Sequence, residues 1–171
     1  IEIRVSASPA DSGPCAVGQA VLPSAATPRA FDVLLHIPCN GTYTISATAV
    51  TTDNNAVVGP EAVALDRRIS VAAPAPTVTG VTAGADGRSV TVSWDDMRGA
   101  APDLDHYTVE RKIGDGDYAE IAELAPDEQS FTDDDLPADG GEASYRVLSA
   151  RPAPGGMVTS QSSEEAATPF D

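Results

Sequence analysis

The stretch GGEASYRVLSARP, residues Gly140–Pro152, decides the fold class of this chain. Two glycines that suit a turn precede an alternation that places Tyr145, Val147 and Ser149 on one side. Successive side chains of a β-strand point to opposite faces, so a period of two over five to eight residues indicates a half-buried strand. The pattern predicts a strand that starts at a turn and buries a tyrosine near its beginning.

A second stretch, PCNGTYTISATAV at residues 38–50, has the same rhythm in the first half of the chain. Its turn is Asn40-Gly41, and the turn also holds Cys39. The strand after it places on one face Tyr43, Ile45, Ala47 and Ala49. Both halves are therefore expected to be built from β-strands.

Alternation recurs along the whole chain, and no window of eleven or more residues shows a convincing helical stripe. In the first half the predicted strands cover residues 2–8, 31–37, 42–50 and 68–73. In the second half they cover residues 77–85, 89–94, 106–112, 117–124, 129–136, 144–150 and 157–169. Seven short strands separated by turn signals predict a β-sandwich for the second half.

The segment VAAPAPTVTGV, residues 71–81, marks a domain boundary. Pro74 and Pro76 cannot continue a ladder from inside a sheet and favour a stiff, extended connection. We therefore expect an all-β protein of two tandem β-sandwich domains, residues 1–73 and residues 74–171. A stiff, short connection also suggests domains stacked in a line.

Residues 76–169 resemble a fibronectin type III domain. The resemblance lies in the proline-rich start PAPTVTGV, in SVTVSW ending at Trp94, in HYTVERK with Tyr107, and in Leu136 followed nine residues later by Tyr145. It implies that Trp94 anchors the core, and that Leu136 and Tyr145 form a tyrosine corner whose hydroxyl bonds the backbone just upstream. It implies almost nothing about function, because such sandwiches host many functions.

The first domain resembles the same corner, with Tyr43 in the place of Tyr145. This similarity implies a shortened immunoglobulin-like sandwich. The first half departs from a full immunoglobulin domain, because it has no tryptophan and no cysteine on the corner strand itself.

The two cysteines, Cys15 and Cys39, allow three interpretations: a disulfide, free thiols in the core, or a metal pair. Zinc would need further ligands, and the only histidines are His36 and His106. A disulfide is the favoured interpretation for a small β domain. Closing this loop would stabilise the domain by roughly 3–4 kcal/mol in the chain-entropy model.

Charge is spread unevenly along the chain. Residues 1–73 carry six acids and four arginines, whereas residues 74–171 carry twenty acids and six bases, a net charge of −14. Such a surface repels nucleic acid and anionic lipid. No run of 18 apolar residues would span a membrane. The start at Ile1, with no signal peptide visible, leads us to expect a piece of a longer protein.

Catalytic and glycan-binding signals are weak. His36 and His106 lie in or beside predicted strands, and neither a G-x-S-x-G motif nor a glycine-rich phosphate loop is present. Only Tyr118 and Phe170 remain as exposed aromatic candidates for stacking on a sugar. Asn40-Gly41-Thr42 matches a glycosylation acceptor, but turn chemistry at Asn40-Gly41 is the favoured interpretation, because both residues tolerate a positive φ.

Three acidic loops form the one feature beyond the scaffold. In the predicted sandwich these loops turn at one end of the domain. One interpretation is a weak calcium site with six candidate ligands: Asp86, Asp115, Asp117, Asp133, Asp134 and Asp135. The competing and favoured interpretation is a solvated acidic end.

We therefore expect a non-catalytic, extracytoplasmic β-sandwich module with no cofactor. It would belong to a secreted or surface protein, suggested to be bacterial by the composition, and would act as a spacer or in protein–protein interaction. Any membrane tether would come from flanking sequence. The alternative is an accessory or carbohydrate-binding module of a secreted enzyme.

Overall fold

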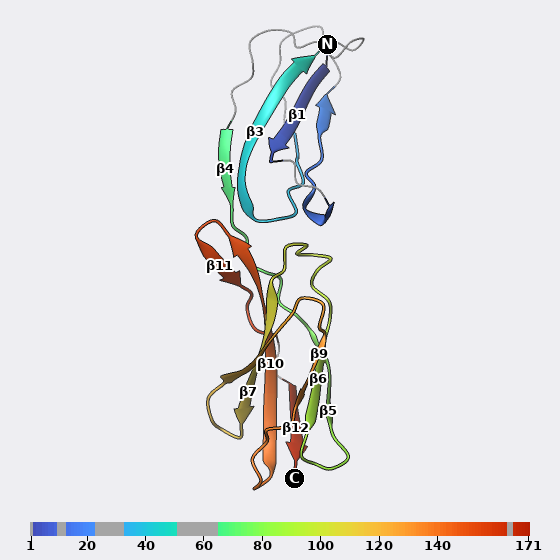
Figure 1. Ribbon diagram of the computed structural model, residues 1–171, viewed down its shortest axis with the longest axis vertical. Coiled ribbons are helices and arrows are strands. Elements are labelled where there is room, and N and C mark those ends of the chain that lie inside the picture. Colours follow the sequence, from blue (N-terminus) through green and yellow to red (C-terminus); the bar gives the residue numbers. More distant parts are fainter. Residues whose placement is uncertain (1, 10–12, 23–32, 51–64, 164–165) are drawn as a thin grey trace. The chain divides into compact units, whose positions relative to one another are not determined.

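The computed structural model describes residues 2–9, 13–22, 33–50, 65–163 and 166–171. These residues are nearly all β, with twelve strands and one short 3-10 helix (Figure 1). The chain divides into two compact units, Ile1–Ser70 and Val71–Asp171. This division falls three residues before the boundary expected from the sequence. No helix in the described part of the chain has the length and apolarity that a membrane crossing requires.

The first unit is built on one four-stranded antiparallel sheet in the order β2-β1-β3-β4. Its strands are β1 (Glu2–Ser8), β2 (Ala20–Leu22), β3 (Gly41–Val50) and β4 (Leu65–Ile69), and the 3-10 helix Gly13–Cys15 follows β1. Val5 and Ala7 of β1 are buried and pair with Ala47 and Ile45 of β3, on the face that also carries the buried Tyr43. The alternation in EIRVSAS thus orients β1, whereas the other buried residue of β3, Val50, lies on the face opposite Tyr43.

The strand predicted at residues 31–37 is not found in its described part. Residues 33–37 have no regular secondary structure and join no sheet. Their burial still alternates, because Val33, Leu35 and Ile37 are half-buried while Leu34 is 96% exposed. The sequence pattern predicts which side chains turn inward here but not the hydrogen bonding. Phe31, which began this predicted strand, lies outside the described residues.

The second unit is a sandwich of two antiparallel sheets. One has the order β5-β6-β9, and the other has the order β11-β10-β7-β8, with β12 also pairing β10. The strands are β5 (Val78–Ala83), β6 (Val90–Trp94), β7 (His106–Ile113), β8 (Ala119–Leu124), β9 (Ser130–Asp133), β10 (Gly141–Ala153), β11 (Gly156–Thr159) and β12 (Ala166–Phe170).

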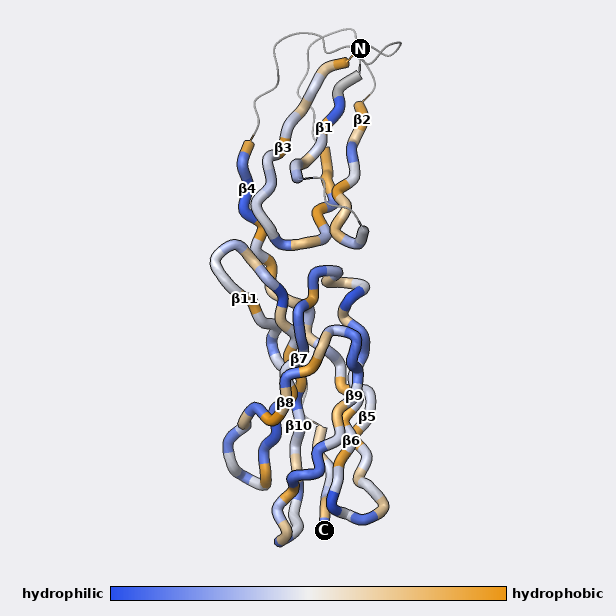
Figure 2. The backbone as a smooth tube through the Cα atoms, in the orientation of Figure 1, coloured by the Kyte–Doolittle hydropathy of each residue, from blue (hydrophilic) through white to orange (hydrophobic). Residues whose placement is uncertain are grey.

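The core of the second unit lies between these sheets. The strand β6 alternates buried and half-buried residues along its whole length, as its sequence predicts. Val92, Val109 and Val147 come from three strands and are each fully buried. In Figure 2 the apolar colouring of β6 contrasts with the hydrophilic loops at the same end of the unit.

The final segment, expected as one strand at residues 157–169, is interrupted in the structure. Its two parts, β11 and β12, both pair β10, and their registers differ by two residues. Between them, the side-chain oxygens of Ser160 and Ser163 accept hydrogen bonds from the backbone N–H groups of Ser149 and Val147, both at 2.9 Å. These two serines therefore provide hydrogen-bond acceptors for backbone N–H groups of β10 at the point where the regular ladder is interrupted.

Candidate functional site

A buried polar group with several partners in the second unit is the carboxylate of Asp133, at the end of β9. It accepts hydrogen bonds from the Tyr145 hydroxyl at 2.8 Å and from Nη1 of Arg111, which lies 2.9 Å from each carboxylate oxygen. The backbone N–H of Asp135 donates a further bond at 3.2 Å. Because Asp133 belongs to one sheet and Arg111 and Tyr145 to the other, this cluster joins the two sheets.

This cluster is largely shielded from solvent. Tyr145 is fully buried, and the side chains of Asp133 and Arg111 are 3% and 18% exposed. Burial, and then the hydrogen bond to Asp133, raise the pKa of the Tyr145 hydroxyl well above its ordinary value. Groups enclosed in this way cannot reach a substrate, so the cluster is a structural pin.

The tyrosine corner expected at Tyr145 therefore differs from the prediction in its hydrogen-bond acceptor. The Tyr145 hydroxyl bonds the side chain of Asp133, twelve residues upstream, and not the backbone. Leu136 is partly buried against the core, as its corner role requires. The physical reason for the difference is that Arg111 holds Asp133 in place as a charged acceptor, and a charged acceptor makes the stronger hydrogen bond.

Trp94 and Tyr107 both lie in the core of the second unit. Trp94 is 3% exposed and Tyr107 is fully buried, and their rings meet edge to face with centroids 5.6 Å apart. The Tyr107 hydroxyl accepts a hydrogen bond from the backbone N–H of Met97 at 2.8 Å. Burial raises the pKa of this hydroxyl. The pair thus ties the loop after β6 to the core.

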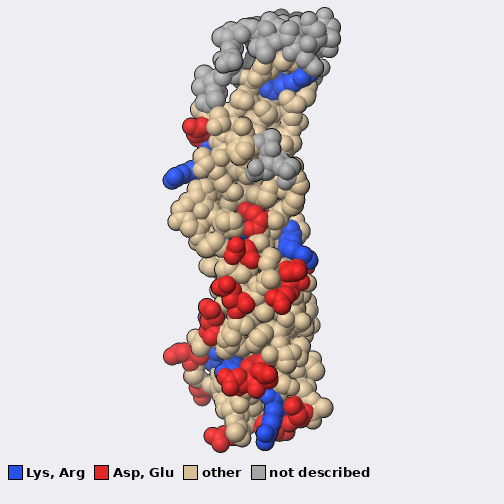
Figure 3. Space-filling model, viewed as in Figure 1, with Lys and Arg blue, Asp and Glu red and all other residues tan. Residues whose placement is uncertain are grey.

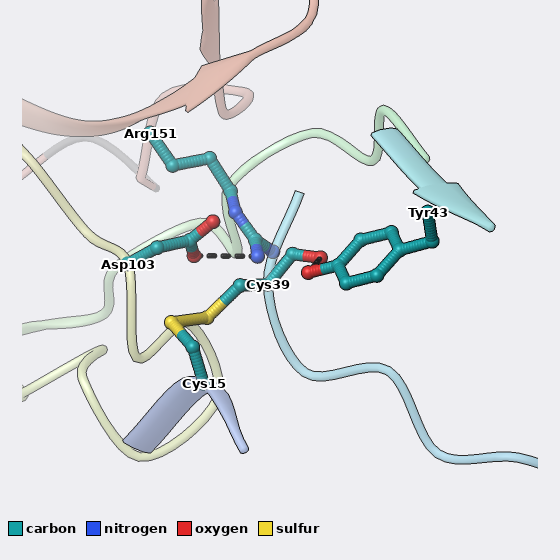
Figure 4. Close-up of a disulfide and its surroundings, with 5 residues drawn as sticks. All are labelled: Cys15, Cys39, Tyr43, Asp103 and Arg151. Atoms are coloured by element: carbon teal, nitrogen blue, oxygen red, sulfur yellow. Dashed lines mark hydrogen bonds and ion pairs between the residues drawn. A yellow bond between two sulfur atoms is a disulfide. The ribbon is translucent and has the colours of Figure 1, made fainter. Parts of the chain in front are cut away.

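In the first unit Cys15 and Cys39 form a disulfide with Cα atoms 5.4 Å apart (Figure 4). The Tyr43 hydroxyl, which is buried, donates to the carbonyl of Cys39 at 3.1 Å. The resemblance implied a backbone-bonded corner at both tyrosines, and the structure has it at Tyr43 but not at Tyr145. Gly41 opens β3 without a positive φ, and a Cβ there would lie 3.1 Å from the Tyr43 ring. Close approach to this ring, and not turn geometry, explains the glycine.

The six acidic residues considered for calcium do not converge. Their three loops do turn at one end of the second unit, because Val90 pairs with Asp133 and Ile113 pairs with Ala143. However, Asp133 is buried in the pin, while the remaining five carboxylates are exposed: Asp86, Asp115, Asp117, Asp134 and Asp135. Among the described residues no group of three or more acidic, histidine or cysteine side chains is arranged to hold a metal ion.

Asp86 has a local structural role in its loop. Its carboxylate accepts bonds from the Arg88 backbone N–H at 3.0 Å and the Ser89 hydroxyl at 3.3 Å. The bond from Arg88 is the main reason that the pKa of Asp86 is lowered. The side chain therefore shapes the β5–β6 turn.

Aspartates at the opposite end of the second unit also have protein partners. Asp95 accepts a hydrogen bond from the Thr77 backbone N–H at 2.5 Å. The carboxylate of Asp96 accepts hydrogen bonds from Nε and Nη2 of Arg98. Asp103 pairs with Arg151 at 2.5 Å (Figure 4). The Asp103–Arg151 pair could not be predicted from the sequence, since 48 positions separate its members. The Asp96–Arg98 spacing of two was visible.

The histidines do not form a catalytic arrangement. His36 is exposed. Nδ1 of His106 lies 2.8 Å from the carboxylate of Asp105, and Nε2 lies 3.8 Å from that of Glu123. One ring nitrogen of His106 therefore faces a carboxylate just before β7, and the other faces a carboxylate on the neighbouring strand β8.

The two aromatic candidates for glycan stacking are occupied. Phe170 is 4% exposed and belongs to the core, which corrects the expectation that it is free. The guanidinium of Arg146 and the ammonium of Lys112 lie over the Tyr118 ring, 4.0 Å and 5.2 Å from its centroid. Arg146 also pairs with Glu110 across β7 and β10. Figure 3 shows that acidic side chains outnumber basic ones on the visible face of this unit.

Comparison with known proteins identifies no family. No family model matches the chain, and no curated protein matches it. Among solved structures, pectate lyase Pel3 from Pectobacterium carotovorum aligns with 55% of this chain and 26% of its own at a TM-score of 0.40 and 16% identity. The FN1–FN3 domains of chicken CNTN1 align with 99% of this chain and 55% of their own at a TM-score of 0.46 and 14% identity. The chain thus spans about a quarter and about half of these two structures, and both TM-scores are too low to bear on its function.

Proposed function

We propose that this chain is a non-catalytic spacing module that also offers surfaces for protein–protein interaction. The observation that carries the proposal is the route of the chain through the second unit. Near the entry, the hydroxyl of Ser149 on β10 donates to the carbonyl of Pro74 at 2.6 Å. At the exit, Phe170 pairs with Gly141, and the N–H of Asp171 bonds the carbonyl of Gly87 at 2.9 Å.

Entry and exit therefore lie at opposite ends of the second unit. Ser149 and Gly141 are eight residues apart on β10, which corresponds to roughly 26 Å at about 3.3 Å per residue. A domain that the chain crosses from end to end adds its length to the polypeptide that contains it. A domain with neighbouring termini would add almost none.

The first unit is crossed in the same way. Glu2 of β1 pairs with Val50 at one end of β3, and Ile69 of β4 pairs with Gly41 at the other. Nine residues of β3 separate these points, or roughly 30 Å at about 3.3 Å per residue. Each unit taken by itself therefore has the chain route that a spacer needs.

The other features are consistent with this role. The most prominent polar clusters of the second unit connect its own strands and loops, and the Cys15–Cys39 disulfide suits an oxidising compartment. We accordingly propose that the chain lies outside the cytoplasm, in a secreted or surface protein. An accessory module of a secreted enzyme remains the second candidate, although the burial of Phe170 weakens its carbohydrate-binding form.

Single-molecule stretching from both ends of the full chain tests the proposal. The second unit has 101 residues, Val71–Asp171. Its unfolding should appear as one cooperative step that gains roughly 33 nm, given about 3.6 Å per extended residue and a folded span of about 3 nm. Gradual extension without such a step would contradict the proposal, because a spacer must hold its length under load.

A further inference from the structure

The outer strands of the second unit differ in how they discourage pairing with another chain. Exposed edge strands are open to such pairing, and charge, proline, irregularity and shortness discourage it. On β8 the exposed residues include Glu120 and Glu123, and β5 has a register shift between Val78 and Gly80. Pro169 lies within β12, and β9 has only four residues. Each of these strands has a recognisable protection.

Within Gly156–Thr159 the strand β11 has no charged residue and no proline, and its one positive φ, 136°, is at its first residue, Gly156. It is short, but the edge continues beyond it, because the backbone N–H groups of Ser160 and Ser163 bond the carbonyls of Ser149 and Val147 at 2.8 Å. The whole run from residue 152 to residue 163 is uncharged in a unit with a net charge near −14. Met157 on this edge is 47% exposed.

The register identifies the backbone groups that face outward from β11. Pro152, which has no N–H, pairs with Met157, and Ala150 pairs with Thr159. The bond from Ser160 N–H to Ser149 carbonyl marks the next pair as hydrogen-bonded, and such pairs alternate in an antiparallel ladder. The N–H and C=O groups of Met157 and Thr159 therefore point away from β10, where a further strand would meet them.

We propose that the free edge of β11 is a docking site for an extended strand from a basic protein partner. Strand addition derives its affinity from backbone hydrogen bonds, and here it requires no charge to be buried along the edge. The acidic remainder of the unit attracts a partner with Lys or Arg beside the pairing segment. A second copy of this chain would bring an equally negative unit to the same edge, so charge disfavours it.

This inference rests on the interaction part of the proposed function. Its probe is a synthetic ten-residue peptide, KKTVTVTVKK, added to the ¹⁵N-labelled full chain, with EETVTVTVEE as the acidic control. The basic peptide should shift the amide signals of Met157 and Thr159, and the acidic peptide should bind at least tenfold more weakly. No shift at this edge, or shifts only in the acidic loops, would overturn the proposal.

Three variants test the backbone contacts. Thr159→Pro removes an outward N–H and should weaken peptide binding at least tenfold, whereas the matched Thr159→Val should preserve it. Met157→Lys changes an exposed side chain and adds a repelling charge, so it should also weaken binding even if Thr159→Pro fails to fold. Equal binding by the folded variants would refute the site.

Sedimentation equilibrium of the chain alone tests whether a second copy of this chain occupies the edge. A dimer that Thr159→Pro converts to a monomer would assign the edge to a second copy and overturn the basic-partner proposal. The stretching experiment does not depend on this edge. Failure of strand docking would therefore leave the spacing role intact, and the two results are distinguishable.

Discussion

Replacing Asp133 with alanine should strongly destabilise the second unit. The substitution leaves the Tyr145 hydroxyl without its acceptor, and the Arg111 guanidinium keeps its bond to the Asp135 carbonyl at 2.8 Å. Breaking a buried ion pair costs about 3–5 kcal/mol. Because Arg111 retains one partner and is 18% exposed, we expect the lower end, about 3 kcal/mol.

Urea unfolding measured by tryptophan emission is the appropriate assay. Trp94 is the only tryptophan in the chain and lies in the core of the second unit, so its emission reports this unit. Tyr145→Phe removes only one hydrogen bond to a charged acceptor and should cost about 1.5–3 kcal/mol. The control is Asp134→Ala, an exposed neighbour, which should remain within about 0.5 kcal/mol of the parent.

A double variant and a comparison of two single variants test whether the buried ion pair causes this loss of stability. The double variant Arg111→Met, Asp133→Leu should be more stable than Asp133→Ala alone, because apolar side chains can replace a buried pair without leaving a charge. If Asp133→Ala and Asp134→Ala unfold at the same urea concentration, the cluster does not hold the two sheets together.

The remaining predictions concern the core, the pH dependence and the disulfide. Trp94→Ala should lower the free energy of unfolding by about 3–5 kcal/mol in urea titrations followed by circular dichroism, and an unchanged midpoint would contradict its core role. Burial raises the pKa of Tyr145 above the value of about 10 in the unfolded chain, so its contribution to stability is fully present below about pH 10 and is lost as pH rises toward the folded pKa. Urea midpoints should therefore fall above pH 10, and less steeply in Tyr145→Phe; parallel slopes would argue against this linkage. Reducing the disulfide should cost the first unit about 3–4 kcal/mol, seen as a lower melting temperature of its β-sheet signal while the Trp94 transition stays in place.

The core of the second unit was predictable from sequence because alternation states directly which side chains turn inward. Trp94, Tyr107 and Tyr145 all lie where the period of two places them. The interrupted last strand was not predictable, because Ser160 and Ser163 act through their side chains where a regular ladder would use carbonyls. Serine in a strand-like stretch has no pattern that distinguishes this use from an ordinary exposed position.

The cluster of Asp133, Arg111 and Tyr145 could be predicted from the sequence only in part. Arg111 continues the apolar face of Tyr107 and Val109, and an arginine at such a position requires a buried partner. The sequence could not identify that partner, because Asp133 stands in a run of three aspartates that look alike. Only the pairing of Val90 with Asp133 selects the first of them for the interior.

The proline-rich boundary was predicted to connect the domains as a stiff linker. In the structure the Pro74 carbonyl is bonded to Ser149, and Thr77 exchanges backbone and side-chain bonds with Asp95. These contacts make the segment part of the second unit. They depend on residues that are far away in sequence, so local composition could not indicate them.

A distance measured across the second unit tests the central claim most directly. Spin labels on Ala75→Cys and Ala138→Cys of the full chain would mark the entry of the chain and the loop beside its exit, and the native cysteines are held in their disulfide. Pulsed electron resonance should give one narrow distribution near 26 Å, roughly the span of eight strand residues, widened by the label arms. A separation below about 15 Å, which is fewer than five strand residues, would place entry and exit at the same end and contradict the spacing role.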